Sequence, residues 1–125
     1  MGQTINVSDD GKYLILKISG EINRKTAMEY NIESHKKGKE LGIKKYLCDL
    51  IDAKNIETNI DNYVFAYKDM QNPMAVDTTA CVAMVVNPED HSHDFVETVS
   101  RNAGLNVKLF RDYNKAVEYL KSIKY

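Results

Sequence analysis

Residues 79–86, Thr79-Ala80-Cys81-Val82-Ala83-Met84-Val85-Val86, form the most hydrophobic stretch of the chain. A second apolar run, Tyr46-Leu47-Cys48-Asp49-Leu50-Ile51, precedes it. Both runs are short and nearly continuous, which is typical of strands that are buried on both faces. Such strands occupy the interior of a parallel sheet, so we expect helices to cover the sheet.

The segments around these two runs complete an α/β pattern. Residues 4–7 and 13–18 predict two strands, joined by a hairpin turn at Asp10-Gly11. Helices are predicted from an N-cap at Asn23 to about Leu41, with Gly42 as the stop, over residues 59–71, from Pro88 to Ala103 and from an N-cap at Asn114. A last strand is predicted over residues 107–110. The order β-β-α-β-α-β-α-β-α predicts an α/β fold, with a mixed five-stranded sheet and four helices in one domain over residues 1–125.

The composition limits the class of partner. The chain has 125 residues, of which 17 are basic and 18 acidic, and its net charge of −1 argues against a nucleic-acid partner. Cys48 and Cys81 lie inside apolar runs, so we expect buried free thiols. No apolar run approaches the roughly 20 residues of a membrane span, and polar residues follow Met1 where a signal peptide would be apolar. The expected location is cytoplasmic.

No motif in the sequence points to catalysis. A nucleophile elbow, a glycine-rich phosphate loop and a paired-cysteine motif are all absent from the sequence. His91 and His93 have a spacing that invites comparison with a metal site. In a first helical turn, residues two apart point in different directions, so we interpret both as solvated or capping histidines. We therefore predict no catalytic residue, no cofactor, no metal site and no enzymatic activity.

Three stretches resemble the STAS domain family, in particular its SpoIIAA-like branch of small bacterial and archaeal proteins. Residues Leu14–Asn23 are similar to the family's opening strand, Gly-x-Ile/Leu-Thr/Asn and helix. Residues Tyr46–Asp52 are similar to its central strand. The third stretch is Ala80–Val86 with the final Lys108–Asp112, and this final part is similar to the family's closing strand, Phe-x-Asp and helix. The resemblance extends from about Ile5 to Ile123. It implies a SpoIIAA-like fold and a non-catalytic regulatory module that docks a protein partner, a kinase or another regulator, and it is compatible with a homodimer.

The resemblance also implies a regulatory site. In the anti-sigma antagonists of this family, a Ser or Thr at the start of the helix after the central strand accepts a phosphate that switches docking. Ile56-Glu57-Thr58 corresponds to that position, which makes Thr58 the candidate phospho-acceptor. The residues that follow, Asn59-Ile60-Asp61-Asn62, depart from the small residues and Gly-Leu of the family pattern. A simple helix N-cap at Thr58 or Asn59 is the alternative. The candidate docking loop comprises Asp52, Asn55, Glu57 and Thr58.

An alternative function follows from the aromatic residues of the second predicted helix. Tyr63 and Tyr67 lie one helical turn apart, and together with Met70 and Phe95 they are candidates for a groove between the second and third helices. Tyrosine and methionine suit both adaptable binding surfaces and the edges of a core, so ordinary core packing remains open. If the groove exists, the chain is a carrier or sensor of a small apolar or lipid-like molecule.

Overall fold

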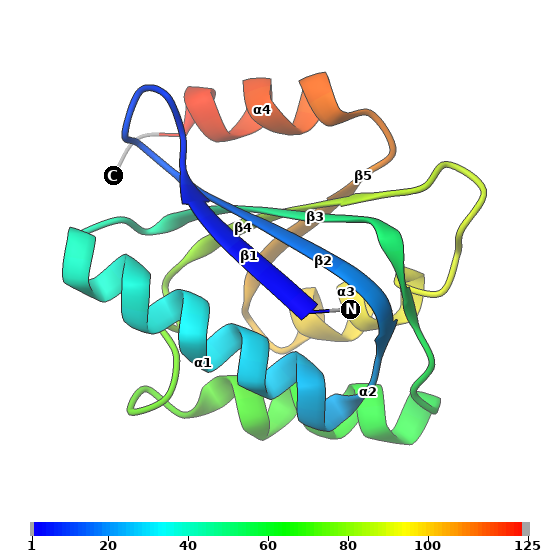
Figure 1. Ribbon diagram of the computed structural model, residues 1–125. Helices are drawn as coiled ribbons and strands as arrows, with labels where there is room; N and C mark the ends of the chain where they lie inside the picture. The colour runs from blue at the N-terminus through cyan, green and yellow to red at the C-terminus, as the bar shows by residue number, and fades with distance from the viewer. Residues whose placement is uncertain (1, 124–125) are drawn as a thin grey trace.

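The computed structural model describes residues 2–123, and its elements follow the predicted order (Figure 1). Its five strands are β1 (Gly2–Val7), β2 (Leu14–Ile22), β3 (Lys45–Asn55), β4 (Cys81–Val86) and β5 (Asn106–Phe110). Its helices are α1 (Arg24–Leu41), α2 (Asn59–Tyr67), a short 3-10 helix η1 (Asp69–Gln71), α3 (Asp94–Asn102) and α4 (Tyr113–Ser122). None of the helices in the described part of the chain is long and apolar enough to cross a membrane.

The sheet has the strand order β1-β2-β3-β4-β5. β1 pairs with β2 in antiparallel fashion, whereas the β2–β3, β3–β4 and β4–β5 pairs are parallel. The predicted mixed five-stranded sheet with four α-helices is therefore confirmed. The parallel arrangement places the carboxyl ends of β2 to β5 at one edge, where binding sites of such sheets commonly form.

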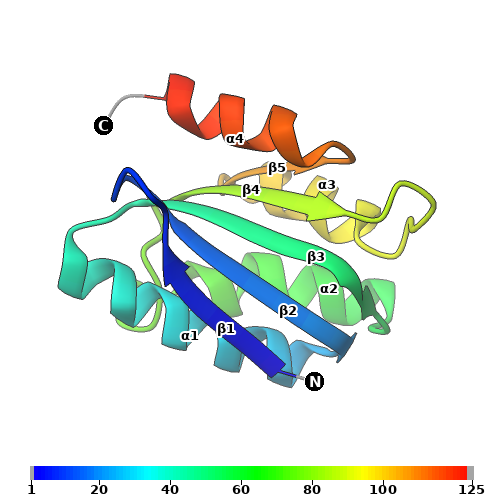
Figure 2. The same ribbon diagram turned by 45° about the horizontal axis from the view of Figure 1, so that its top comes forward.

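The helices divide unequally between the two faces of the sheet. α4 alone covers one face, and α1, α2 and α3 lie on the other (Figures 1 and 2). On the α4 face, Leu120 packs against Leu47 and Ala83 in one hydrophobic cluster. On the opposite face, the cluster includes Ile18, Leu50 and Met84. Successive residues of a strand point to opposite faces of the sheet. The apolar runs at residues 46–51 and 79–86 therefore contribute side chains to both clusters.

Local signals at both ends explain the length of α1. The Asn23 side chain accepts a hydrogen bond from the Thr26 backbone N–H at 2.9 Å, and Thr26 Oγ1 accepts one from the Asn23 backbone at 3.0 Å. This reciprocal arrangement satisfies two backbone donors at the helix start. Gly42 follows the helix with φ of 68°, a left-handed conformation that favours glycine. The predicted helix over residues 23–41 is confirmed.

Several predicted boundaries were wrong, each for a local reason. β3 continues past Ile51 to Asn55, because β2 bulges between Lys17 and Ser19 and then resumes pairing with it. The helix predicted over residues 59–71 is instead α2 followed by η1. α4 begins at Tyr113, since Asp112 rather than Asn114 caps it by accepting a hydrogen bond from the Lys115 N–H.

The start of α3 also differs from the prediction. Residues 87–93 form turns instead of the first part of a helix, and α3 begins at Asp94. The side chains of Asn87 and Asp90 accept hydrogen bonds from the backbone N–H groups of Glu89 and Ser92. Local bonds of this kind compete with helix formation. The segment thereby reaches back over the carboxyl end of β3 before α3 starts.

Candidate functional site

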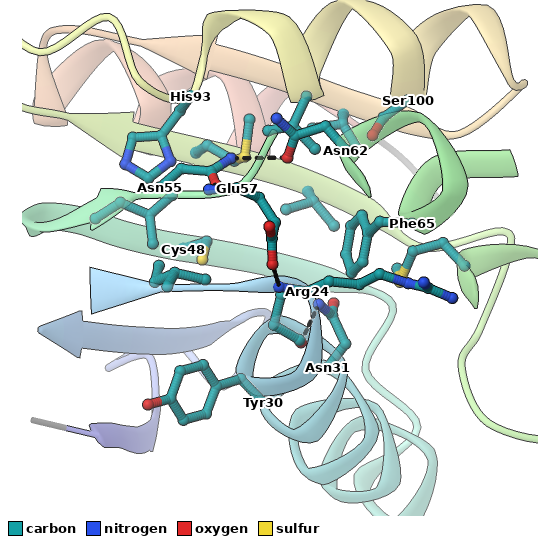
Figure 3. A pocket seen from close by; sticks show the side chains of 18 of the residues that line it. Arg24, Tyr30, Asn31, Cys48, Asn55, Glu57, Asn62, Phe65, His93 and Ser100 are labelled. Carbon is teal, nitrogen blue, oxygen red and sulfur yellow. Dashed lines mark hydrogen bonds between the residues drawn. The ribbon is translucent and has the colours of Figure 1, made fainter. Parts of the chain in front are cut away.

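A cavity of about 120 Å³ lies between the sheet and the layer formed by α1, α2 and α3. Its walls are mostly apolar (Figure 3). The sheet contributes aliphatic side chains, α1 contributes Ala27 and Tyr30, and α2 contributes Phe65. The main aliphatic residues are Ile18, Ile22, Leu50, Val82, Met84 and Val107.

The cavity exists because α2 stands back from the sheet. α2 packs mainly against α3 and makes only a few contacts with α1, while α3 packs on β5 and α1 on β2. Phe65 of α2 and Met70 of η1 line the cavity from this outer layer. Protein interiors rarely leave voids larger than a water molecule. A space of this size is therefore a structural feature that needs an explanation.

One end of the cavity is polar and lies at the carboxyl ends of the strands. Asn55, at the end of β3, donates through Nδ2 to Asn62 Oδ1 of α2 at 3.0 Å. His93 precedes α3 and places Nε2 3.1 Å from the carbonyl oxygen of Ala53. Both bonds tie the helices to the end of β3. They also hold Asn62 and His93 against the cavity wall, where both are buried.

Arg24 lines the cavity at the start of α1. Its guanidinium donates two hydrogen bonds to Asp69, Nε to Oδ2 at 2.7 Å and Nη2 to Oδ1 at 3.0 Å. The Arg24 backbone N–H donates to Glu57 Oε2 at 2.8 Å, at the positive end of the α1 dipole (Figure 3). The two-pronged ion pair joins the start of α1 to η1, and the Glu57 bond joins it to the segment before α2.

The cysteine that lines the cavity, Cys48, has a thiol of low reactivity. Burial raises the pKa of the Cys48 thiol to about 12, and the neighbouring Asp49 carboxylate adds to the shift. The thiol therefore stays protonated at neutral pH, and a thiol is a much weaker nucleophile than a thiolate. Within residues 2–123, no group of three or more His, Cys, Asp or Glu side chains is arranged to hold a metal ion.

The candidate docking residues separate into two groups. Asn55 and Glu57 line the cavity, and Glu57 caps α1. Asp52 and Thr58 are exposed. Asp52 lies within β3 rather than in a loop, and its carboxylate pairs with Lys17 Nζ at 3.1 Å. The predicted loop is thus reduced to the short segment between Asn55 and the start of α2.

Thr58 is the N-cap of α2. Its Oγ1 accepts a hydrogen bond from the Asp61 backbone N–H at 3.2 Å and donates to Asp61 Oδ2 at 3.1 Å. The Thr58 backbone N–H donates to Glu57 Oε1 at 3.3 Å. The exposed hydroxyl is reachable, but a phosphate on it would meet the carboxylates of Asp61 and Glu57. Repulsion between like charges works against an ordered phosphorylated cap.

The four candidate groove residues do not come together. Met70 is buried and lines the cavity, while Tyr63, Tyr67 and Phe95 are exposed and are not among its lining residues. The rings of Tyr63 and Tyr67 stack on the surface with their centroids 4.5 Å apart. The groove prediction placed Tyr67 between the second and third helices, but the buried residues of α2 are Asn62 and Ala66. The hydrogen bond between Asn55 and Asn62 joins that face of α2 to the end of β3.

The two histidines of the discounted metal pair have different surroundings. His91 is exposed, and its Nδ1 lies 2.8 Å from Asp94 Oδ2. His93 was interpreted as solvated or capping; it occupies the N-cap position of α3, but its side chain makes no capping hydrogen bond and the residue is only 2% exposed. The turns before α3 place His93 at the cavity between the sheet and the helices. The sequence contains no signal for this, because the pattern around His93 resembles any polar loop.

Sequence reasoning also missed the other buried polar residues of the cavity. Asn62 and Ser100 line it from α2 and α3 and are 6% and 4% exposed. The sequence contains a weak signal for the burial of Asn62, because Asn62 lies one helical turn from Ala66 and these two are the buried residues of α2. Residues Ala27, Tyr30 and Asn31 of α1 have the spacing of one helical face, and all three line the cavity.

Comparison with known proteins gives the fold a context. No family model matches the sequence, and no curated protein is significantly similar to it. Solved structures do match. An uncharacterized protein of the DUF3478 family with a SpoIIAA-like fold, from Shewanella loihica PV-4, has a TM-score of 0.52 and 15% identity. The match covers 95% of this chain and 92% of that one.

A second solved structure is the anti-sigma factor antagonist SpoIIAA in its unphosphorylated form. It matches with a TM-score of 0.53 and 10% identity, and the match covers 98% of this chain and 100% of that one. At these identities the likeness concerns the fold. The predicted SpoIIAA-like fold is therefore confirmed.

Proposed function

We propose that this chain is a non-catalytic binding domain that holds a small apolar molecule in the cavity between its sheet and helices. The observation that carries the proposal is the size and lining of that cavity, about 120 Å³ with mainly apolar walls. Binding sites for small molecules are typically concave and apolar, with a few placed polar groups. Asn55, Asn62 and His93 supply such groups at one end.

The energetic cost of an empty cavity supports an occupant. At about 24 cal/mol for each Å³, a sealed and empty space of about 120 Å³ would cost about 3 kcal/mol of stability, which is an upper limit for this partly open cavity. That is a large share of the roughly 5–15 kcal/mol by which small domains are stable. Moving a helix toward the sheet, or enlarging one side chain, would remove the cost. A cavity that is kept in spite of it is best explained by a ligand.

The side chains at the cavity favour binding over reaction. The Cys48 thiol has a raised pKa, and the hydrogen bonds of Asn55, Glu57 and Arg24 are directed at protein groups. A nucleophile activated by an adjacent base would be expected of a hydrolase or transferase. The arrangement instead holds the helices in place around the apolar space.

The test is a cavity-filling substitution with a matched control. Ala27→Leu adds a larger apolar side chain where α1 lines the cavity, and Lys37→Leu adds the same side chain on the exposed side of α1. Protein purified from its own host is analysed by native mass spectrometry. We expect a bound small molecule on the parent and on Lys37→Leu, and its loss from Ala27→Leu. An apo mass for the parent, with no thermal stabilisation by small apolar compounds, would refute the proposal.

A second candidate function is protein docking, and a different surface favours it. Ile60, Tyr63 and Tyr67 lie at helical spacing on the outer side of α2 and are 76%, 52% and 41% exposed. Exposed apolar patches mark interaction sites, and tyrosine is enriched at interfaces. In this second function, a regulatory protein partner binds the patch. Phosphorylation of Thr58, which lies beside the patch, remains a prediction of the same function.

Docking is tested by a double substitution, Tyr63→Ser with Tyr67→Ser. The control is Tyr113→Ser, which changes an exposed tyrosine at the start of α4, on the other side of the sheet. A partner must be retained by the parent and the control, be lost by the double variant, and bind again as a purified protein. Dimerisation of the parent that the double variant abolishes would assign the patch to a second copy of the chain. Equal binding by all three proteins would remove this candidate.

A further inference from the structure

We infer that the ligand of the cavity is an uncharged apolar molecule carrying a single hydrogen-bonding group, and not a carboxylate or an amine. This inference rests on the proposed ligand-binding function. It follows from three buried polar side chains on the helix-side wall, Asn62, His93 and Ser100, together with the commitment of Arg24 elsewhere. Figure 3 shows these residues around the same space.

The polar groups on this wall have unused hydrogen-bonding capacity. Asn62 accepts through Oδ1 from Asn55, while its Nδ2 group has no partner within residues 2–123. The Ser100 hydroxyl also lacks a partner among these residues, although the side chain lies almost wholly inside the protein. Among the described residues, Gln3 Oε1 is the one buried side-chain N or O atom without a partner, so Asn62 Nδ2 and Ser100 Oγ keep accessible surface and are open to water or to a ligand group. A ligand oxygen could accept from Asn62 Nδ2 or from the Ser100 hydroxyl.

His93 adds an acceptor. Its Nε2 faces the Ala53 carbonyl oxygen at 3.1 Å, and a carbonyl oxygen only accepts, so Nε2 carries the hydrogen. Nε2 also lies 3.6 Å from Asp90 Oδ2. With the hydrogen on Nε2, Nδ1 is an acceptor, and it makes no hydrogen bond with another residue of the described chain. Asn62 and Ser100 provide donors and His93 provides an acceptor. A hydroxyl group, which both donates and accepts, fits this wall better than a group that does only one.

No compensating charge is available for an ionised ligand. Arg24 is the one Lys or Arg side chain lining the cavity in the described chain, and Asp69 already binds it through two hydrogen bonds. A ligand carboxylate would therefore be buried unpaired, near Glu57 and Asp61. An ammonium group would have to draw Glu57 from the α1 N-terminus or Asp61 from Thr58. Burying an ion without a partner is far more costly than burying a hydrogen-bonded neutral group.

The volume sets the scale of the ligand. An engineered apolar cavity of about 150 Å³ binds benzene, so a space of about 120 Å³ suits a molecule with a single small ring or a short aliphatic chain. Three compounds of nearly equal size carry different polar groups: benzyl alcohol is neutral, benzoate is an anion that only accepts hydrogen bonds, and benzylammonium is a cation that only donates them. Toluene supplies the same ring without a polar group.

The experiment measures the affinity of the full chain for these four compounds at pH 7 by NMR titration. Benzyl alcohol is expected to bind at least about 10-fold more tightly than benzoate and benzylammonium, a difference of 1.4 kcal/mol or more. Ser100→Ala is expected to reduce the preference for benzyl alcohol over toluene by about threefold or more, the effect of one lost hydrogen bond. Ser122→Ala on α4, outside the cavity, should leave that preference unchanged.

The outcomes separate the inference from the function on which it rests. Benzoate or benzylammonium binding as tightly as benzyl alcohol would overturn the inference while leaving the ligand-binding function intact. An unchanged preference in both Ser100→Ala and Asn62→Leu would also overturn it, because the polar wall would then play no part. Failure of all four compounds to bind, in a protein that carries no ligand from its host, would refute the function itself.

Discussion

We predict that His35 makes the folded domain less stable at mildly acidic pH than at neutral pH. The imidazole lies inside the fold on α1, 2% exposed, and stacks on the Tyr46 ring with centroids 4.7 Å apart. Its Nδ1 accepts a hydrogen bond from the Asp77 backbone N–H at 2.7 Å. Burial lowers the pKa of His35 from 6.5 to about 4, despite the opposing effect of the Asp77 carboxylate. Lys39 adds a smaller lowering effect.

The sign and size of the effect follow from linkage. Between pH 6.5 and 4 the unfolded chain binds a proton at His35 that the folded chain excludes, so stability falls as the pH falls through this window. Protonation would also remove the acceptor of the Asp77 N–H. The full difference corresponds to about 3 kcal/mol, of which about 2 kcal/mol is lost between pH 7 and pH 5. Above pH 7 the contribution is constant.

The assay is urea unfolding followed by circular dichroism at pH 7 and pH 5. The comparison is between the parent and His35→Asn, whose Oδ1 replaces Nδ1 as an uncharged acceptor. We expect the parent to lose about 2 kcal/mol more than the variant on acidification. Carboxylates that titrate at lower pH affect both proteins equally, so they cancel in the difference. Equal losses in parent and variant would show that His35 does not exclude the proton, and would refute the reasoning.

Three further predictions concern single side chains. Gly38→Ala should destabilise the fold by about 1–3 kcal/mol in thermal or urea unfolding, since the added Cβ would lie 1.9 Å from Tyr46 Oη; an unchanged stability would show that Tyr46 moves aside freely. Thr58→Ala should lower the free energy of unfolding by about 1 kcal/mol through loss of the α2 cap, whereas Thr58→Ser should retain it. In a Cys81→Ser background, the half-buried Cys48 thiol should react with a disulfide reagent at pH 8 far more slowly in the native protein than in urea, because its pKa is raised to about 12; equal rates would contradict the raised pKa.

The order of elements was readable from local patterns. The apolar runs at residues 46–51 and 79–86 are too short and too continuous to be anything but buried strands in this context, and they became β3 and β4. Asn23 and Gly42 marked the ends of α1 because capping depends on residues that are adjacent in sequence. The fold followed, since few topologies satisfy this order with short connections.

The orientation of α2 was not readable, and for a definite reason. Apolar side chains occur on several sides of this helix, including Ile60, Tyr63, Phe65 and Tyr67, so periodicity does not select one inner face. The bond from Asn55 to Asn62 and the packing against α3 decide which side faces the sheet. These are contacts between residues of different elements. The groove expected from Tyr63, Tyr67, Met70 and Phe95 depended on that orientation.

The sequence by itself therefore determined a hairpin-led α/β domain of SpoIIAA-like fold and the absence of a recognisable catalytic motif. The tertiary structure alone decided that α2 stands away from the sheet, that an apolar cavity lies beneath it, and that Asn62, His93 and Ser100 are buried along its wall. The physical reason is that strands, helices and caps arise from interactions between near neighbours, whereas a cavity is the space left after distant elements have packed. No local pattern encodes that space.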